Sequence, residues 1–169
     1  DYCDEWEVED FYATKYLVMA FNTTDSPIQP GCGNLIEFEL NGEATGLSEI
    51  TFFTVLDSQT KLLAFDYYDE HDIADGCDLP DMNLHITENG NVLFNSSNSI
   101  SHFQFNIDGA RILEVSGGKA KDNNFHFQFD HCRQFTNYDN DGDFFGTSGL
   151  NLNECNNKKT IICDPVINW

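Results

Sequence analysis

Apolar and polar residues alternate along most of the chain, and this period of two predicts β-strands. Asn34–Leu40 places three apolar side chains on one face, and Asn124–Asp130 alternates phenylalanine with polar residues in the same way. Lys15–Phe21 is an apolar run of strand length. The one candidate helix, Glu5–Tyr16, lacks a sustained apolar stripe. The pattern therefore predicts an all-β fold.

Short polar connections between the expected strands predict three hairpins. Asn-Gly and Asp-Gly pairs favour such turns because both residue types adopt positive φ at low cost. The hairpins pair Ser48–Leu56 with Lys61–Tyr68, Met82–Ile86 with Val92–Phe94 around Asn89-Gly90, and His102–Ile107 with Arg111–Val115 around Asp108-Gly109. Consecutive hairpins favour a single antiparallel up-and-down β-barrel over residues 1–169, with a β-sandwich as the alternative.

Composition supports a globular chain with an unusual charge. The 169 residues are 40% hydrophobic and 14% aromatic, which is enough apolar surface for one folded domain. The formal net charge of −21 argues against recognition of nucleic acid or an anionic membrane through charge, because phosphate binding depends on clustered cations. No apolar run approaches the length of a membrane span. A neutral or cationic partner is expected, and the oligomeric state stays open.

The cysteines and two sequons indicate a secreted protein. Six scattered cysteines without a C-x-x-C pair predict three disulfides, and 15 pairings are possible in principle; they are Cys3, Cys32, Cys77, Cys132, Cys155 and Cys163. Asn22 and Asn95 begin N-glycosylation sequons. Because the chain starts at Asp1, we interpret it as a processed mature form.

One acidic segment has the spacing of a calcium loop. Oxygen-bearing side chains occur at alternate positions, Asn137, Asp139, Asp141 and Asp143, with a glycine at the sixth position. The twelfth position is Ser148, where a glutamate would normally complete the coordination sphere. The alternative is a solvated acidic turn, so calcium is the one possible cofactor.

No pattern for catalysis stands out. His102 and His126 fall on the polar side of their strands, and the chain has neither a G-x-S-x-G elbow nor a glycine-rich phosphate loop. Paired carboxylates distinguish nothing in a chain with 29 acids. We therefore expect a protein that is not an enzyme.

The aromatic strand faces are the main candidate for a binding site. A barrel of eight strands can hold one small ligand if its interior is not filled, and the expected lining is Phe52, Phe65, Tyr67, Phe103, Phe105, Phe125 and Phe127. Glu39 and Asp66 would suit an ammonium group if they point inward, through charge pairing and cation–π contact. The alternative is that the aromatic side chains simply form the core.

The N-terminal segment resembles a known family. Cys3, Asp10-Phe11-Tyr12, the strand at Tyr16–Ala20, the following Phe21–Pro27 and Cys32 are similar to the divergent arthropod branch of the lipocalins, especially tick salivary lipocalins that bind amines or lipid mediators. A late strand ending at Cys132 adds to the likeness, which implies Cys3–Cys132 and Cys32 paired with Cys155 or Cys163. The family's Gly-x-Trp is here Thr14-Lys15-Tyr16.

Together these observations predict a secreted binding protein that holds a small hydrophobic or amine ligand inside a β-barrel. The alternative is an acidic structural, adhesive or storage glycoprotein that acts through its outer surface, with calcium as a possible requirement. A third reading is a protein-binding inhibitor or immune modulator, which would carry an exposed apolar patch.

Overall fold

The computed structural model describes residues 15–22, 24–135 and 160–167. Its elements, in chain order, are β1 (Lys15–Phe21), β2 (Gly31–Asn41), β3 (Gly46–Leu56), β4 (Gln59–Leu63), β5 (Asp66–Tyr67), η2 (Gly76–Asp78), β6 (Asn83–Ile86), β7 (Asn91–Ser96), β8 (His102–Asp108), β9 (Arg111–Ser116), α2 (Gly118–Asp122), β10 (His126–Phe135) and β11 (Thr160–Ile167). The prediction of an all-β fold is confirmed.

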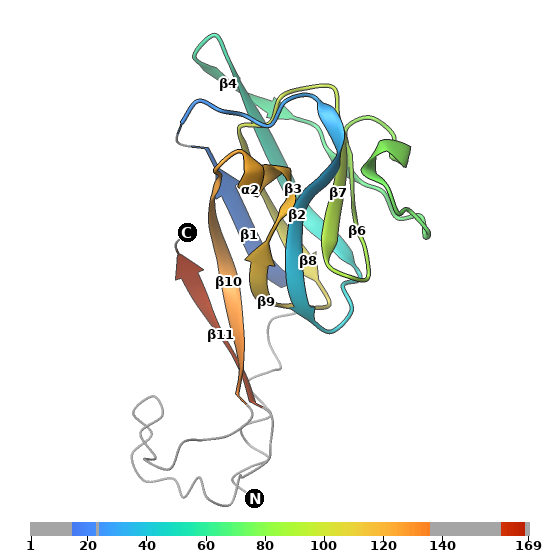
Figure 1. Ribbon diagram of the computed structural model, residues 1–169, viewed down its shortest axis with the longest axis vertical. Coiled ribbons are helices and arrows are strands. Elements are labelled where there is room, and N and C mark those ends of the chain that lie inside the picture. The colour runs from blue at the N-terminus through green and yellow to red at the C-terminus, as the bar shows by residue number, and fades with distance from the viewer. Residues whose placement is uncertain (1–14, 23, 136–159, 168–169) are drawn as a thin grey trace, which may run out of the picture.

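The strands form two mainly antiparallel halves (Figure 1). One half has the order β4-β3-β8-β1-β10, with β11 also on β10, and the other has the order β9-β2-β7-β6-β5. The halves are joined where β9 and β10 run parallel, at the single residue pair Ile112–His131. Strands β4 and β5 are the two ends of this path, and no pairing between described residues closes it into a barrel.

Local pairing was easier to predict than strand order. The hairpin β6–β7 is confirmed. The pairing of β3 with β4 is confirmed too, but the predicted second strand, Lys61–Tyr68, is wrong in its bounds, because β4 ends at Leu63 and Asp66–Tyr67 forms β5, which pairs with β6. The predicted hairpin of His102–Ile107 with Arg111–Val115 is wrong, because β8 pairs with β1 and β3 while β9 pairs with β2 and β10. The chain leaves one half at Gly109, which has a φ of 84°, and enters the other. The order is therefore not up-and-down.

Alternation along the strands separates an inner from an outer face. Phe52, Phe103 and Ala20 lie opposite one another on three neighbouring strands and are fully buried. One residue further along, Phe53, His102 and Phe21 form a partly exposed row on the outer face. The core also takes side chains from the second half, since Phe38 of β2 meets Phe105 of β8 edge to face at 6.3 Å.

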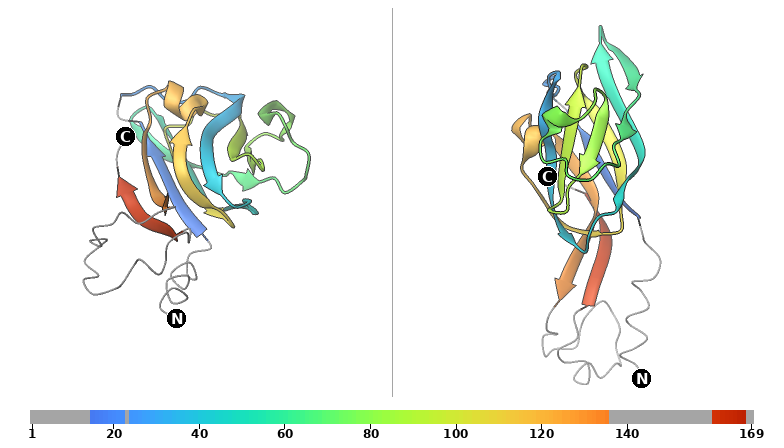
Figure 2. Two further views of the ribbon diagram at one scale, coloured as in Figure 1. Left: turned by 60° about the horizontal axis from the view of Figure 1, so that its bottom comes forward. Right: turned by 90° about the vertical axis from the view of Figure 1, so that its right-hand side faces the viewer.

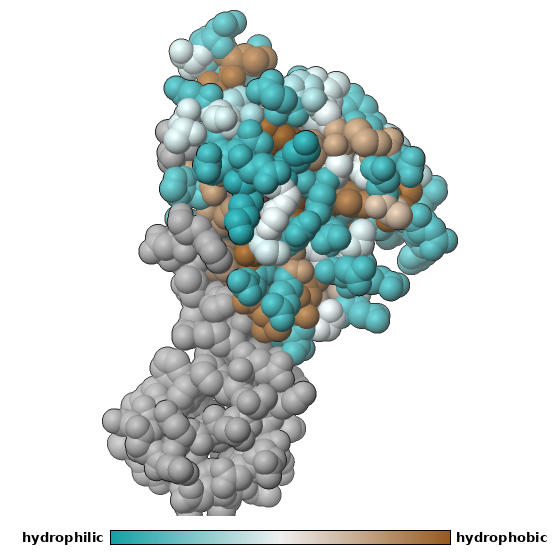
Figure 3. All heavy atoms as spheres, viewed as in Figure 1, coloured by the Kyte–Doolittle hydropathy of each residue, from teal (hydrophilic) through white to brown (hydrophobic). Residues whose placement is uncertain are grey.

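The β3–β4 hairpin reaches beyond the core at the top of Figure 1, and it also forms the top of the side view on the right of Figure 2. Its turn residues Asp57 and Ser58 both have positive φ, 51° and 62°, as a two-residue type I′ turn requires. Val55, Leu56 and Leu62 are exposed on this hairpin, and hydrophobic atoms show at the top of Figure 3.

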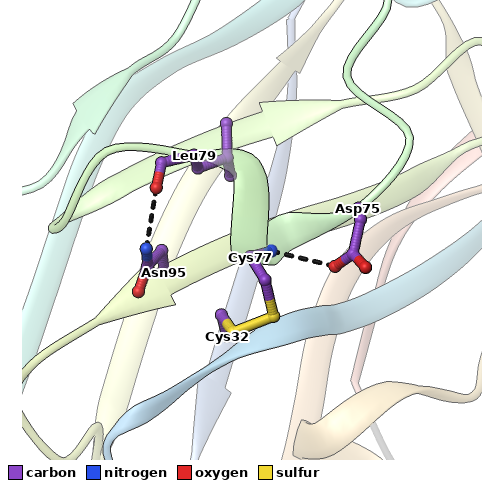
Figure 4. Close-up of a disulfide and its surroundings, with 5 residues drawn as sticks. All are labelled: Cys32, Asp75, Cys77, Leu79 and Asn95. Atoms are coloured by element: carbon purple, nitrogen blue, oxygen red, sulfur yellow. Dashed lines mark hydrogen bonds between the residues drawn. A yellow bond between two sulfur atoms is a disulfide. The ribbon is translucent and has the colours of Figure 1, made fainter.

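A disulfide fastens the long connection between β5 and β6 to strand β2. Cys32 is bonded to Cys77 of η2, with a Cα–Cα distance of 4.9 Å (Figure 4). The pairing of Cys32 with Cys155 or Cys163, implied by the family resemblance, is therefore wrong. The β10–β11 register places Cys132 opposite Cys163, whereas Cys3 and Cys155 lie outside the described residues.

Gly76 and Asp75 explain how this connection approaches the sheet. A Cβ at Gly76 would lie 2.3 Å from the Gly33 carbonyl oxygen, so only glycine fits at this contact. The Asp75 carboxylate accepts a hydrogen bond from the Cys77 N–H at 2.9 Å, and the Asn95 amide donates to the Leu79 carbonyl at 2.7 Å. Figure 4 shows these contacts around the disulfide.

Candidate functional site

The phenylalanines expected to line an internal pocket contact one another. The Phe52 ring stacks on Phe65 at a centroid distance of 4.2 Å and on Phe103 at 5.2 Å. Phe103 in turn stacks on Phe105 at 5.8 Å and on Phe125 at 6.0 Å. Together with the buried Phe127 they belong to one hydrophobic core. The geometry here is that of the alternative reading, a packed core.

The two acids expected near this lining are not brought to it. Glu39 and Asp66 are both exposed. Asp66 precedes Tyr67, and successive residues of a strand point to opposite faces, so only one of the pair can face inward. Tyr67 is the one that is partly buried.

A large open hollow lies instead at the end of the molecule where the β2–β3 and β6–β7 turns meet. Its volume is about 680 Å³, within the range of ligand pockets. We call it the acidic hollow. Its described lining is Glu43, Ala44, Thr45, Tyr67, Asp69, His71, Asp72, Ile73, Ala74, His85, Ile86, Thr87, Glu88, Asn89 and Asn91.

Backbone pairing brings these distant segments together. The Phe38 N–H donates to the Gly90 carbonyl at 2.9 Å, which holds the β6–β7 turn against β2. A Cβ at Gly90 would lie 2.3 Å from the Phe38 oxygen, and φ there is 85°, so glycine is required. On the other side β5 runs parallel to β6, with the Tyr68 N–H donating to the Leu84 carbonyl at 2.7 Å.

Tyr67 and His85 form an aromatic wall of the acidic hollow. Their rings stack at a centroid distance of 5.9 Å with planes 15° apart. The Nδ1 atom of His85 lies 2.8 Å from the Tyr68 carbonyl oxygen, which fixes the imidazole. Gly46 leaves room for the tyrosine ring, since a Cβ there would lie 3.3 Å from Tyr67 Cε1.

The electrostatics of the acidic hollow favour positive charge. Four of its described lining residues are exposed carboxylates, Glu43, Asp69, Asp72 and Glu88, and no lysine or arginine is among them. Burial raises the pKa of the Tyr67 hydroxyl above 10.0; a backbone hydrogen bond with Ile86 lowers it, and the charges of Asp69 and Asp108 raise it. The tyrosine therefore stays a neutral ring, whose face attracts cations.

The two sequon asparagines already use their amides within the fold. The Asn22 amide donates to the Ser26 and Asn123 carbonyls, and its Oδ1 accepts from the Thr24 N–H at 2.6 Å. Asn95 donates to Leu79 as described above. A glycan on either nitrogen would remove a donor from these contacts; glycosylation stays a prediction.

The remaining sequence candidates are the calcium loop and the strand histidines. Asn137, Asp139, Asp141 and Asp143 lie outside the described residues. Within residues 15–22, 24–135 and 160–167, no group of three or more histidine, cysteine or acidic side chains is arranged to hold a metal ion. In the same part of the chain, no helix is long and apolar enough to cross a membrane. His102 and His126 lie on the outer face, where each contacts the Phe21 ring.

Sequence reasoning found Tyr67 but missed its neighbours in the acidic hollow. Asp69 and Asp72 belong to the acid-rich segment 68–72, which is a visible signal. Glu43 and Glu88 are single acids in turns. The pairing of β2 with β7 brings their two turns together, and the pairing of β5 with β6 brings the segment 68–72 beside them.

Comparisons with known protein families, with curated proteins and with solved structures found no match for this chain. The resemblance to lipocalins therefore stays a prediction.

Proposed function

We propose that the protein is a secreted, non-enzymatic binding protein that holds a small organic amine in the acidic hollow. The observation that carries the proposal is the placement of four carboxylates around the stacked Tyr67–His85 pair, with no basic side chain except histidine in the described lining. The sequence predicted a small hydrophobic or amine ligand inside a barrel. The proposal keeps the amine and assigns it to an open hollow at one end of the molecule.

The two parts of the site suit the two parts of such a ligand. A protonated amine gains charge pairing with the carboxylates and a cation–π contact with the tyrosine face. The apolar remainder can lie against the Tyr67–His85 wall and the side chains of Ile73 and Ile86. A chain with a net charge of −21 also attracts cations over a long range at low salt.

The proposal is tested by isothermal titration with 3-phenylpropylamine and its neutral analogue 3-phenylpropanamide. We expect the amine to bind more tightly, and its affinity to fall with added salt because exposed charge pairs are screened. The double variant Asp69→Asn/Glu88→Gln should weaken amine binding by roughly two- to fivefold per carboxylate removed.

The matched control is Asp57→Asn, which removes one charge at the β3–β4 turn, at the opposite end of the fold (Figure 1). It should leave amine affinity nearly unchanged. Equal affinities for the amine and the amide, or equal losses of amine affinity in the control and in the double variant, would refute the proposal.

A further inference from the structure

A second, smaller hollow lies beside the short helix α2, and its chemistry differs from that of the acidic hollow. Its volume is about 280 Å³, and most of its surface is apolar. We call it the α2 hollow. The described residues that line it are Thr24, Val115, Lys121, Asn124, Phe125, His126 and Phe127.

The walls of the α2 hollow are formed by helix α2, the start of β10 and the segment that carries Thr24. The Phe125 N–H donates to the Ala120 carbonyl at 2.9 Å, and the Asn124 N–H donates to the Lys121 carbonyl at 3.0 Å, so α2 continues tightly into β10. The Asn22 amide reaches the Asn123 carbonyl at 3.3 Å and connects the segment that carries Thr24 to this turn. The hollow is therefore formed before any ligand binds, which keeps the entropic cost of binding low.

The floor of the α2 hollow belongs to the hydrophobic core. Val115, Phe125 and Phe127 are at most 5% exposed, and the Phe125 ring stacks on Phe103. Some of their surface still faces the hollow. An apolar group placed there would gain roughly 25 cal/mol for each Å² it removes from water. The small volume suits one ring or a short alkyl chain.

The charge at the rim is the opposite of what the composition leads one to expect. The chain has 29 acids and only 8 lysines and arginines, yet none of the described lining residues is acidic and one is Lys121. Lys121 is exposed. Among the described residues, none forms an ion pair with its ammonium group, which a ligand carboxylate can therefore approach.

We infer that the α2 hollow binds a small apolar carboxylic acid, with its ring or alkyl chain against Phe125 and Phe127 and its carboxylate at Lys121. Repulsion by acids farther away than about 10 Å is screened at 0.1 M salt. Asp122 is adjacent to Lys121 in the chain but does not line the hollow, so Lys121 is the one permanently charged side chain among the described residues that line it. The protein then has two sites that select opposite charges.

The test compares three ligands of nearly equal shape, 3-phenylpropanoate, 3-phenylpropanamide and 3-phenylpropylamine, at about 0.15 M salt. Binding is followed residue by residue through amide chemical shifts in NMR spectra. The signals of Val115, Phe125 and Phe127 should respond most strongly to the acid. Those of Tyr67 and His85 should respond to the amine, so each site is judged separately in one experiment.

Lys121→Gln should weaken binding of the acid by about two- to fivefold and leave binding of the amide unchanged. The control Lys119→Gln removes the same charge from another exposed position of α2 that does not line the hollow. Both side chains are exposed, so neither variant should unfold the protein. The inference fails if the signals of Val115, Phe125 and Phe127 do not prefer the acid, or if both lysine variants weaken its binding equally.

Discussion

His102 shows how one register position determines the chemistry of a side chain. It belongs to the outer row, where it lies between Phe53, at 5.6 Å, and Phe21, at 6.3 Å. These rings remove part of its surface from water without offering a charged partner. Burial accordingly lowers the pKa of His102 below the ordinary value of 6.5, and no neighbouring charge contributes.

This lowered pKa predicts a pH dependence of stability. Near pH 6.5 the unfolded chain takes up a proton at His102 more readily than the folded protein does, so acidification through this range favours unfolding. Above this pH range His102 does not contribute to the pH dependence, because its imidazole is neutral in both the folded and the unfolded state. Urea unfolding of wild type and His102→Gln at pH 7.5 and 5.5 should show the smaller loss of stability in the variant. An equal loss in both proteins would contradict the assignment.

At the scale of elements, the sequence predicted the features that residues close together in the chain determine, namely hairpins and the faces of strands. The β3–β4 and β6–β7 hairpins follow from their turns, and the outward position of His102 and His126 follows from alternation. The β8–β9 pairing failed because an Asp-Gly turn also serves a chain that passes from one sheet to the other. The parallel pairing of β5 with β6 leaves no local signal, since parallel strands need a long connection.

The candidate site was harder to predict for the same reason. Tyr67 was found from its aromatic character, but the described lining of the acidic hollow comes from three separate segments, 43–45, 67–74 and 85–91. Cys32 could not be assigned to Cys77 because strand order, and not spacing, brings them together. Whether Glu39 and Asp66 point inward depends on strand register, which the sequence did not determine. In the structure both side chains are exposed.

The disulfide links element structure to ligand binding. It closes a separation of 45 residues and anchors the connection whose beginning lines the acidic hollow. We expect Cys32→Ser/Cys77→Ser to lower the free energy of unfolding by roughly 2–4 kcal/mol, measured by urea denaturation. The same variant should bind 3-phenylpropylamine more weakly under native conditions. Unchanged stability would show that the link does not restrain the unfolded chain.

The whole molecule is dominated by its excess of acids. With a net charge of −21, repulsion among carboxylates opposes the compact state, and added salt should relieve it. Increasing sodium chloride from about 0.02 to 0.3 M should raise Tm by a few degrees, measured by circular dichroism. The same change should weaken amine binding in the acidic hollow. A Tm that stays constant or falls would contradict the first expectation.

The position of β1 has a further consequence for synthesis of the chain. The printed pairings of this strand join it to β8, residues 102–108, and to β10, residues 126–129. At roughly 5–20 residues per second, a ribosome takes about 4–16 s to make residues 22–101, which separate β1 from β8. During that time the apolar segment Tyr16–Phe21 has neither of these neighbours, whereas the β3–β4 and β6–β7 hairpins already have both strands. One of the first strands to be synthesised is thus among the last to be enclosed.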